Sequence, residues 1–301
     1  MSQRPDRARS VATGLLILLT AVWGSTFFLI RDLVDTVPPI DFLAVRFTIG
    51  AVLMVVIFRR PLLALGRRQW LAGAGLGGLY GVAQILQTIG LVHTDASVSG
   101  FITGTYVVLT PLLSALLLRE RIPRATWYAV LLATVGLSVL SLNGVSVGLG
   151  EALTLGAAVV YALHIIGLGR ISTPSHATGM AAVQMLVIAV ICVVAAVPDG
   201  ITWPRGGGQW ASVVYMATVA GALALWIQTW AQAHLSATRA AIVMTLEPVF
   251  AAFFAVLFGN ESLTSRMVVG GLLVLTAMYL VELLGRRAEE PPSEVLHHEV
   301  T

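Results

Sequence analysis

Ten long apolar runs dominate this sequence and leave it few possible folds. Each run has about 20 residues, the length that an α-helix needs to cross the hydrocarbon core of a bilayer. The runs lack the alternation of a barrel strand, so their backbone polar groups must be paired inside helices. The predicted spans are Val11–Ile30, Ile40–Phe58, Trp70–Val92, Ser97–Leu118, Ala125–Leu142, Glu151–Gly169, Ala177–Val197, Trp210–Leu235, Arg239–Phe258 and Met267–Leu284.

The composition agrees with an integral membrane protein. Only 11% of the residues are charged and 57% are hydrophobic, whereas about a quarter of the residues of a soluble domain are charged. All 18 basic residues are arginine, and the absence of lysine excludes a Walker-type phosphate loop. The arginines form short clusters between the apolar runs, not a nucleic-acid-binding stripe. The single cysteine, Cys192, excludes a multi-cysteine metal site. We therefore expect the bilayer as a partner, no nucleic acid, no cofactor and no metal.

The distribution of arginine predicts the topology. If the N-terminus is cytoplasmic, 14 arginines fall on the cytoplasmic side and only Arg31, Arg205 and Arg266 fall outside, with Arg46 inside a helix. This bias follows the positive-inside rule. The first run is too long for a cleaved signal peptide. The prediction is a multi-pass protein of the cell (inner) membrane with both termini in the cytoplasm.

The second half of the sequence echoes the first. A shift of 141 residues places Gln87–Thr88 on Gln228–Thr229 and Glu120 on Glu261. Two five-helix units follow from this match, and because five is odd, the second unit must enter the membrane from the opposite side. Inverted repeats are the architecture of many secondary transporters. The predicted organisation is a cytoplasmic segment 1–10, a first unit 11–142, a linker 143–150, a second unit 151–284 and a polar cytoplasmic tail 285–301.

Polar residues inside the spans indicate where a site lies. With 100° between successive residues, they fall on single faces of their helices, and such faces avoid lipid. Serine and threonine on these faces favour helix packing, whereas glutamine, tyrosine and histidine near mid-span favour a watery cavity. The residues predicted to line a central substrate-binding cavity are Trp23, Gln84, Tyr106, Tyr161, His164, Gln228 and Glu247.

Two charged residues within the spans each have two interpretations. Arg46 either extends to the outer interface or acts as an anion-binding or gating residue. Placing the carboxylate of Glu247 at mid-span costs free energy unless the group is paired, neutral or in contact with water. Pro248, which follows it, has no amide and so frees the carbonyl of Met244. Glu247 is therefore either a local structural donor or a group that binds a substrate amine or couples transport to protons.

Two further motifs favour structural roles. Gly73–Gly78 matches the dinucleotide fingerprint, but it lies inside a predicted span, and Gly73, Gly77 and Gly81 fit close helix packing instead. Glu120 and Glu261 stand at loop starts, where an ion pair or a helix cap is expected.

Several of these segments together resemble the EamA-type transporters of the drug/metabolite transporter superfamily. The resemblance covers about Val11 to Leu284 and is carried by Ala21–Ser25, Val107–Arg121, Leu246–Pro248 and Gly259–Glu261. It implies a fold of ten helices that carries small metabolites, with many members exporting amino acids or drugs. It does not identify a substrate.

The function expected from the sequence is secondary transport of a small metabolite by alternating access, in the direction of export. The compound would be an amino acid, an amino-acid-like compound or a drug-like compound. The alternative is a membrane-embedded scaffold, receptor or enzyme. An enzyme needs clustered catalytic groups at one depth, and the sequence presents none, so we expect a non-enzyme. A homodimer is left open.

Overall fold

The computed structural model describes residues 3–118, 128, 131–132, 135–136, 139 and 148–289, and the described elements are all helical. Six stretches among them are long and apolar enough to cross a membrane. The predicted helix Ala125–Leu142 lies mostly outside the described residues, as do Glu120 and the tail after Glu289. The described helices are α1 (Gln3–Val34), α2 (Pro39–Ile57), α3 (Arg59–Leu63), α4 (Arg67–Gly90), α5 (Ala96–Gly104), α6 (Tyr106–Leu118), α8 (Leu149–Ile171), α9 (Ala177–Ala196), α10 (Gly206–Ala217), α11 (Ala224–Gln232), α12 (Ala237–Val243), α13 (Glu247–Phe258) and α14 (Ser265–Glu289).

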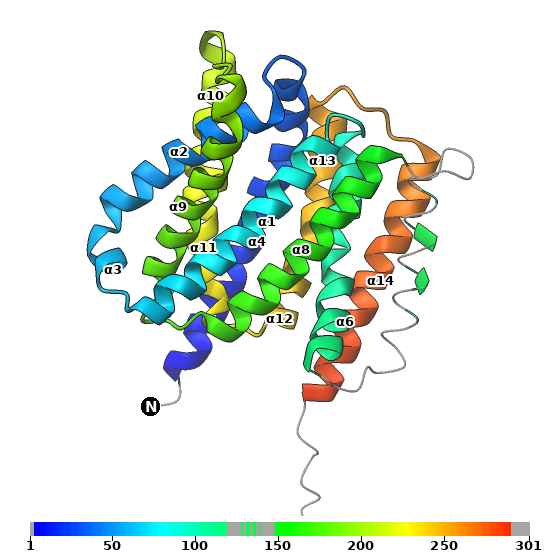
Figure 1. The fold of residues 1–301 in the computed structure, drawn as a ribbon. Coiled ribbons are helices and arrows are strands. Elements are labelled where there is room, and N and C mark those ends of the chain that lie inside the picture. The colour runs from blue at the N-terminus through cyan, green and yellow to red at the C-terminus, as the bar shows by residue number, and fades with distance from the viewer. Residues whose placement is uncertain are drawn as a thin grey trace, which may run out of the picture.

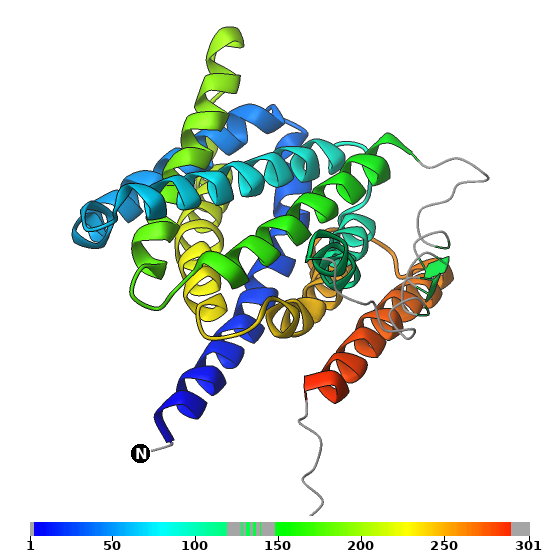
Figure 2. The same cartoon turned by 60° about the horizontal axis from the view of Figure 1, so that its bottom comes forward.

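The helices form one bundle whose exterior is apolar. Large hydrophobic side chains such as Leu18, Val56 and Val194 are more than half exposed, as expected of a surface that faces lipid. Figure 1 shows that α1 begins and α14 ends at the same end of the bundle, and Figure 2 shows the bundle turned by 60°. The described ends of the chain, Gln3 and Glu289, thus lie at one end of the bundle.

Helices from the two halves of the chain pack on one another. α2 lies against α9, α4 against both α8 and α9, and α1 against α13. Small residues permit this approach: a Cβ atom added to Gly77 of α4 would lie 2.8 Å from the Cα atom of Gln184 on α9. The interpretation of these glycines as packing residues is thereby supported, and the described residues form no strand beside the dinucleotide fingerprint.

Two predicted helices are longer in the structure, and one short helix was not predicted. α1 begins at Gln3 and ends at Val34, so the segment before Val11 is part of the helix. Pro5 is tolerated there because it lies in the first turn, where its missing amide has no partner. α14 continues to Glu289, five residues past the predicted end at Leu284. The short helix α3 lies where a plain loop was expected.

Three helices that the sequence predicts as continuous are interrupted in the structure. The fourth is divided at Thr105, whose hydroxyl donates to the carbonyl of Ile102 at 2.6 Å. The eighth contains a π-helical segment, η2 (Thr218–Leu223), between α10 and α11. The ninth contains a 3₁₀ turn, η3 (Met244–Leu246), before Pro248. Proline lacks an amide donor, so it interrupts the helical hydrogen bonds at this point.

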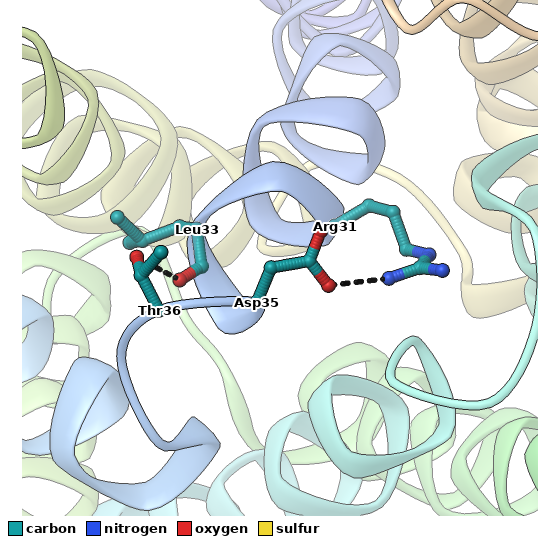
Figure 3. A network of polar contacts seen from close by, with 4 residues as sticks. All are labelled: Arg31, Leu33, Asp35 and Thr36. Atoms are coloured by element: carbon teal, nitrogen blue, oxygen red, sulfur yellow. Dashed lines mark hydrogen bonds and ion pairs between the residues drawn. The ribbon is translucent and has the colours of Figure 1, made fainter.

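The end of α1 shows how the helices are joined at the opposite end of the bundle from the N-terminus. Arg31 pairs with Asp35 at 2.9 Å, and the hydroxyl of Thr36 donates to the carbonyl of Leu33 at 3.2 Å (Figure 3). The same Thr36 hydroxyl accepts a hydrogen bond from Gln209 at 2.8 Å. The loop after α1 is thus connected to the second half of the chain.

Candidate functional site

A buried cavity lies between the two halves and collects most of the residues expected to form a site. The space open to the centres of water molecules is about 40 Å³, which corresponds to a few water molecules. Of the seven nominated residues, six line this cavity, and Arg46 lines it as well. The full lining is Trp23, Thr26, Phe27, Ile30, Arg46, Tyr80, Gln84, Gln87, Thr103, Tyr106, Tyr161, Ile165, Gln228, Met244 and Glu247.

Arg46 of α2 points into the protein and does not extend to the outer interface. Its side chain is fully enclosed, with 2% of the residue exposed. The Nε atom donates to the carbonyl of Met216 at 3.1 Å, and Nη1 donates to Oε1 of Gln84 at 3.3 Å. The guanidinium also lies 5.8 Å from the ring centroid of Phe42 and 5.0 Å from that of Phe47. These aromatic faces stabilise a cation.

A chain of hydrogen bonds runs from Arg46 across the cavity wall. Nε2 of Gln84 donates to the hydroxyl of Tyr161 at 2.6 Å, and that hydroxyl donates to Oε1 of Gln87 at 3.0 Å. Nε2 of Gln87 then donates to the hydroxyl of Thr103 at 3.0 Å. Every donor points the same way along this chain. Because Tyr161 belongs to α8 and the other three to α4 and α5, the chain joins the two halves.

Glu247 stands at the first turn of α13. The hydroxyl of Tyr106 donates to Oε2 of Glu247 at 2.8 Å and approaches the carbonyl of Met244 at 3.2 Å. Pro248 has no amide to donate to the Met244 carbonyl, which accepts instead from the backbone amide of Glu247 and from the hydroxyl of Tyr106. Within the described ranges the one ion pair is Arg31–Asp35, so the buried Glu247 has no cationic partner there.

The π-helical segment η2 and the end of α10 before it each supply a backbone acceptor to the site. Arg46 uses the carbonyl of Met216, just before η2, and Nε1 of Trp23 donates to the carbonyl of Ala220 within it at 3.1 Å. In a π-helix the backbone bonds span five residues instead of four, and such segments recur at functional sites. Gln228, one turn into α11, is buried, and its Oε1 atom has no hydrogen-bond partner among the described residues.

His164 is the nominated residue that does not line the cavity. Its Nε2 atom lies 2.8 Å from Oε1 of Gln184 on α9, and its ring packs against Tyr80 at 5.1 Å between centroids. The residue is fully buried between α4, α8 and α9. Helical periodicity placed it correctly on the inward face of α8, but it lies one turn beyond Tyr161 and packs against α9 there.

The nomination also missed part of the lining. Gln87 and Thr103 also line the cavity, and both are polar residues inside predicted spans that the predicted site does not include. Phe27, Ile30, Ile165 and Met244 carry no signal in the sequence, because an apolar residue that faces a cavity has the same character as one that faces lipid.

Polar contacts also join the halves at the end of the bundle opposite the N-terminus. Oε1 of Glu261 accepts from the amide of Ala96 at 2.7 Å at the start of α5, so its expected role as a helix cap is confirmed. Oδ2 of Asp41 accepts from the amide of Thr202 at 2.9 Å, and the hydroxyl of Thr94 donates to Glu151 at 3.1 Å. Among the residues that the structure describes, no three His, Cys, Asp or Glu side chains gather as a metal site.

Known proteins are similar to this chain in sequence and in fold. The model of the EamA-like transporter family matches it twice, over residues 12–142 and 148–283. An uncharacterized transporter of Archaeoglobus fulgidus is 32% identical over 89% of this chain and 84% of its own length. The pseudopaline exporter CntI of Pseudomonas aeruginosa is 26% identical over 87% of this chain and 93% of its own length. A crystal structure with 20% sequence identity shares the fold with a TM-score of 0.70, over 93% of this chain and 99% of that one. The chain thus belongs to the EamA-like transporter family and is a multi-pass membrane transporter of the drug/metabolite transporter superfamily.

Proposed function

We propose that this transporter is a secondary carrier that exports a small metabolite across the cell (inner) membrane by alternating access. The substrate would be an amino acid, an amino-acid-like compound or a drug-like compound. The observation that carries the proposal is the buried polar cavity, whose wall comes from both halves of the chain. Trp23, Arg46, Gln84 and Tyr106 belong to the first half, and Tyr161, Gln228 and Glu247 to the second.

The architecture proposed for this mechanism is ten helices in two inverted five-helix units, residues 11–142 and 151–284, joined by the linker 143–150. Reciprocal packing supports it: α1 lies against α11 and α13, while α8 lies against α4 and α6. The fourth helical run of each half is also broken near its middle, at Thr105 and at η3. Broken helices at matching positions are typical of substrate sites between inverted repeats.

The small volume of the cavity supports the proposal that the two halves move relative to each other during transport. A space that holds a few water molecules cannot hold a metabolite until its walls separate. In the proposed topology, the contacts of Glu261 with Ala96 and of Asp41 with Thr202 lie on the external side, so they would break when the cavity opens outward. The arginine distribution supports cytoplasmic termini, and the exporter among the relatives supports the direction.

Glu247 is the proposed proton-coupling residue. It lines the cavity, it is buried, and Tyr106 is its hydrogen-bond donor. A carboxylate that is exposed to each side in turn can take up a proton on one side and release it on the other. A substrate amine that competes for the same oxygen atoms would then be exchanged for a proton.

Flux through proteoliposomes tests the proposal. The purified protein is reconstituted, the vesicles are loaded with the isotopically labelled proteinogenic amino acids, and efflux is followed with and without a pH gradient. We expect efflux of at least one compound, accelerated by the gradient in the wild-type protein. Glu247→Gln preserves shape and hydrogen bonding, so it should fold and lose the acceleration. A scaffold, a receptor or an enzyme gives no flux in any vesicle.

The proposed topology has its own test. Single cysteines at Leu65 and Ser146 in a Cys192→Ala background should react with an impermeant thiol reagent from opposite sides of the membrane. Reaction of both from outside intact cells would contradict the five-plus-five arrangement.

A further inference from the structure

A second hollow lies on the lipid-facing surface of the bundle, between α2 and α9. The space open there to the centres of water molecules is about 470 Å³, more than ten times that of the central cavity. Val52, Val56, Val190 and Val194 on its walls are each more than half exposed. We call this hollow the α2–α9 groove, and its lining is Thr48, Ala51, Val52, Val55, Val56, Leu186, Ala189, Val190, Val193 and Val194.

Two small residues give the groove its depth. Ala51 of α2 and Ala189 of α9 line it and are buried, so they form its floor. From Thr48 to Val56 the groove follows α2 for about 12 Å, at 1.5 Å per residue. One leaflet of the hydrocarbon core of a bilayer is about 15 Å thick. The length and the apolar wall of the groove thus fit one acyl chain of a lipid.

Four arginines follow the groove along the chain without a negative partner. Arg59 and Arg60 begin α3, Arg67 and Arg68 begin α4, and all four are exposed. None of them forms an ion pair with another described residue. The sequences of α3, α4 and α9 contain no aspartate or glutamate, and the one carboxylate of α2, Asp41, lies in its first turn at the other end. The helices that meet at this corner of the bundle therefore leave its positive charge unbalanced.

The groove and the first two arginines adjoin each other. Val56, in the last turn of α2, lines the groove. Backbone hydrogen bonds of helical spacing, such as that from the amide of Phe58 to the carbonyl of Met54, run through the junction of α2 and α3. Residues three and four apart on a helix lie about 5–6 Å apart, which is the separation of Arg59 and Arg60 from Val56 along the chain. α3 also packs on α9, and Figure 1 shows it at the end of α2. Two guanidinium groups are thus within reach of a lipid headgroup at this end of the groove.

An exposed tryptophan indicates that this corner lies at the level of the lipid headgroups. Trp70 stands in the first turn of α4, after Arg67 and Arg68, and is more than a third exposed. Tryptophan is enriched at membrane–water interfaces. Leu63 of α3 is 73% exposed, so α3 presents apolar and cationic side chains at the same boundary. This combination is typical of segments that bind anionic lipids.

We propose that an anionic glycerophospholipid binds at this corner, with one acyl chain in the α2–α9 groove and its phosphate on Arg59 and Arg60. Arginine suits a phosphate because its planar fork of donors bonds to two oxygen atoms side by side. A phospholipid whose headgroup carries an ammonium group fits the groove equally well, but it brings another cation to helices that hold no carboxylate there. The groove therefore supplies affinity for a phospholipid, and the arginines select the headgroup. This site is separate from the central cavity and does not depend on the proposed transport.

Native mass spectrometry of the purified, delipidated protein measures the binding directly. Phosphatidylglycerol and phosphatidylcholine with the same acyl chains are titrated separately, and the dissociation constant of the first bound lipid is determined for each. We expect phosphatidylglycerol to bind at least tenfold tighter, because its headgroup adds no cation beside the arginines. sn-Glycero-3-phosphoglycerol, the same headgroup without acyl chains, should not displace it even in large excess, because it cannot occupy the groove.

Two double variants separate these arginines from general surface charge. Arg59→Gln with Arg60→Gln should weaken the binding of phosphatidylglycerol at least tenfold, to the level of phosphatidylcholine. Arg7→Gln with Arg9→Gln removes the same charge from exposed positions of α1 and should change the affinity for neither lipid.

A second pair of variants tests the groove. Val190→Phe places a larger side chain on its exposed wall and should weaken the binding of both lipids at least fivefold. Val269→Phe makes the same change at a similarly exposed position of α14 and should leave both affinities unchanged. Val52→Phe, on the α2 wall, takes the place of Val190→Phe if circular dichroism shows that the latter does not fold.

Four results would overturn the proposal. Equal affinities of the wild-type protein for the two phospholipids would remove the selection of the headgroup. Equal losses in the two double variants would reduce the effect to general attraction of a basic protein to acidic lipid. Displacement by the headgroup without acyl chains would show that phosphate binds without the groove. Unchanged binding in a folded Val190→Phe or Val52→Phe variant would place the lipid elsewhere. Because no flux is measured, failure of the transport proposal leaves this site untouched, and the reverse also holds.

Discussion

The third helical run of each half reaches the cavity in a different way. In the first half, α4 is continuous from Arg67 to Gly90 and contributes side chains, including Gln84 and Gln87. In the second half, α10 and α11 are separated by η2, and this run contributes two backbone carbonyls in addition to Gln228.

This difference bears on how the halves are coupled. A side chain can change rotamer while its helix stays in place, whereas a backbone carbonyl moves only with its helix. Arg46 and Trp23 of the first half are both bound to carbonyls of the second half, those of Met216 and Ala220. A displacement of α10 and α11 therefore acts directly on the cation of the cavity, while a displacement of α4 is transmitted through flexible glutamines.

The largest expected effect concerns the packing of α4 against α9 at Gly77. Gly77→Leu places a side chain against the backbone of Gln184, which cannot move aside. We expect a loss of stability at or above the upper end of the ~1–3 kcal/mol that overpacking costs. Detergent-solubilised protein should show little monodisperse material in size-exclusion chromatography. Gly78→Leu is the matched control, because no atom lies within 4 Å of an added Cβ there. Equal behaviour of the two variants would contradict the packing role.

The second effect removes the π-helical segment itself. Deletion of Val219 takes one residue out of η2, so the run can close as a regular α-helix with its flanking residues in their present register. Arg46 should then lose the Met216 carbonyl, a bond to a charged group worth about 1.5–3 kcal/mol. We expect folded protein with transport reduced at least tenfold, measured by vesicle flux and circular dichroism. Wild-type flux from the deletion variant would show that η2 does not serve the site.

The third effect tests the hydrogen bonds that join Gln84 and Gln87 of α4 to Tyr161 of α8. Tyr161→Phe deletes the hydroxyl that both Gln84 and Gln87 use. Hydrogen bonds inside membrane proteins contribute about 0.6 kcal/mol on average and up to about 1.7 kcal/mol, so two of them should lower the free energy of unfolding by about 1–2 kcal/mol. Thermal unfolding measures this change. Tyr128→Phe on the exposed surface is the control, and a drop of the same size in that variant would argue against the network.

The smallest effect concerns Trp23. Trp23→Phe retains an aromatic ring in the cavity wall and removes the donor to Ala220. A loss of about 0.6 kcal/mol is expected from the bond alone. If η2 acts through its backbone, this variant combined with the Val219 deletion should lose no more stability than the deletion by itself. Additive losses would instead show that Trp23 and η2 contribute independently.

Much of the architecture could be predicted from local pattern. Runs of about 20 apolar residues must become helices in lipid because nothing else pairs their backbone groups. The 3.6-residue period places Gln84, Tyr106 and Tyr161 on inward faces, and all three are buried in the structure. The missing hydrogen bond from residue 248 to the Met244 carbonyl is likewise a local consequence of a proline that has no amide.

Other features were decided only by the tertiary structure. Arg46 could have reached the interface, but its Nε atom donates to the carbonyl of Met216, 170 residues away in α10. This carbonyl lies just before the π-helical segment η2, which the sequence of the run Trp210–Leu235 does not predict. His164 shares the inward face of Tyr161, yet it binds Gln184 instead of lining the cavity. Periodicity specifies the direction in which a side chain points. The group that it meets at that depth depends on how distant helices cross, and no local pattern contains that information.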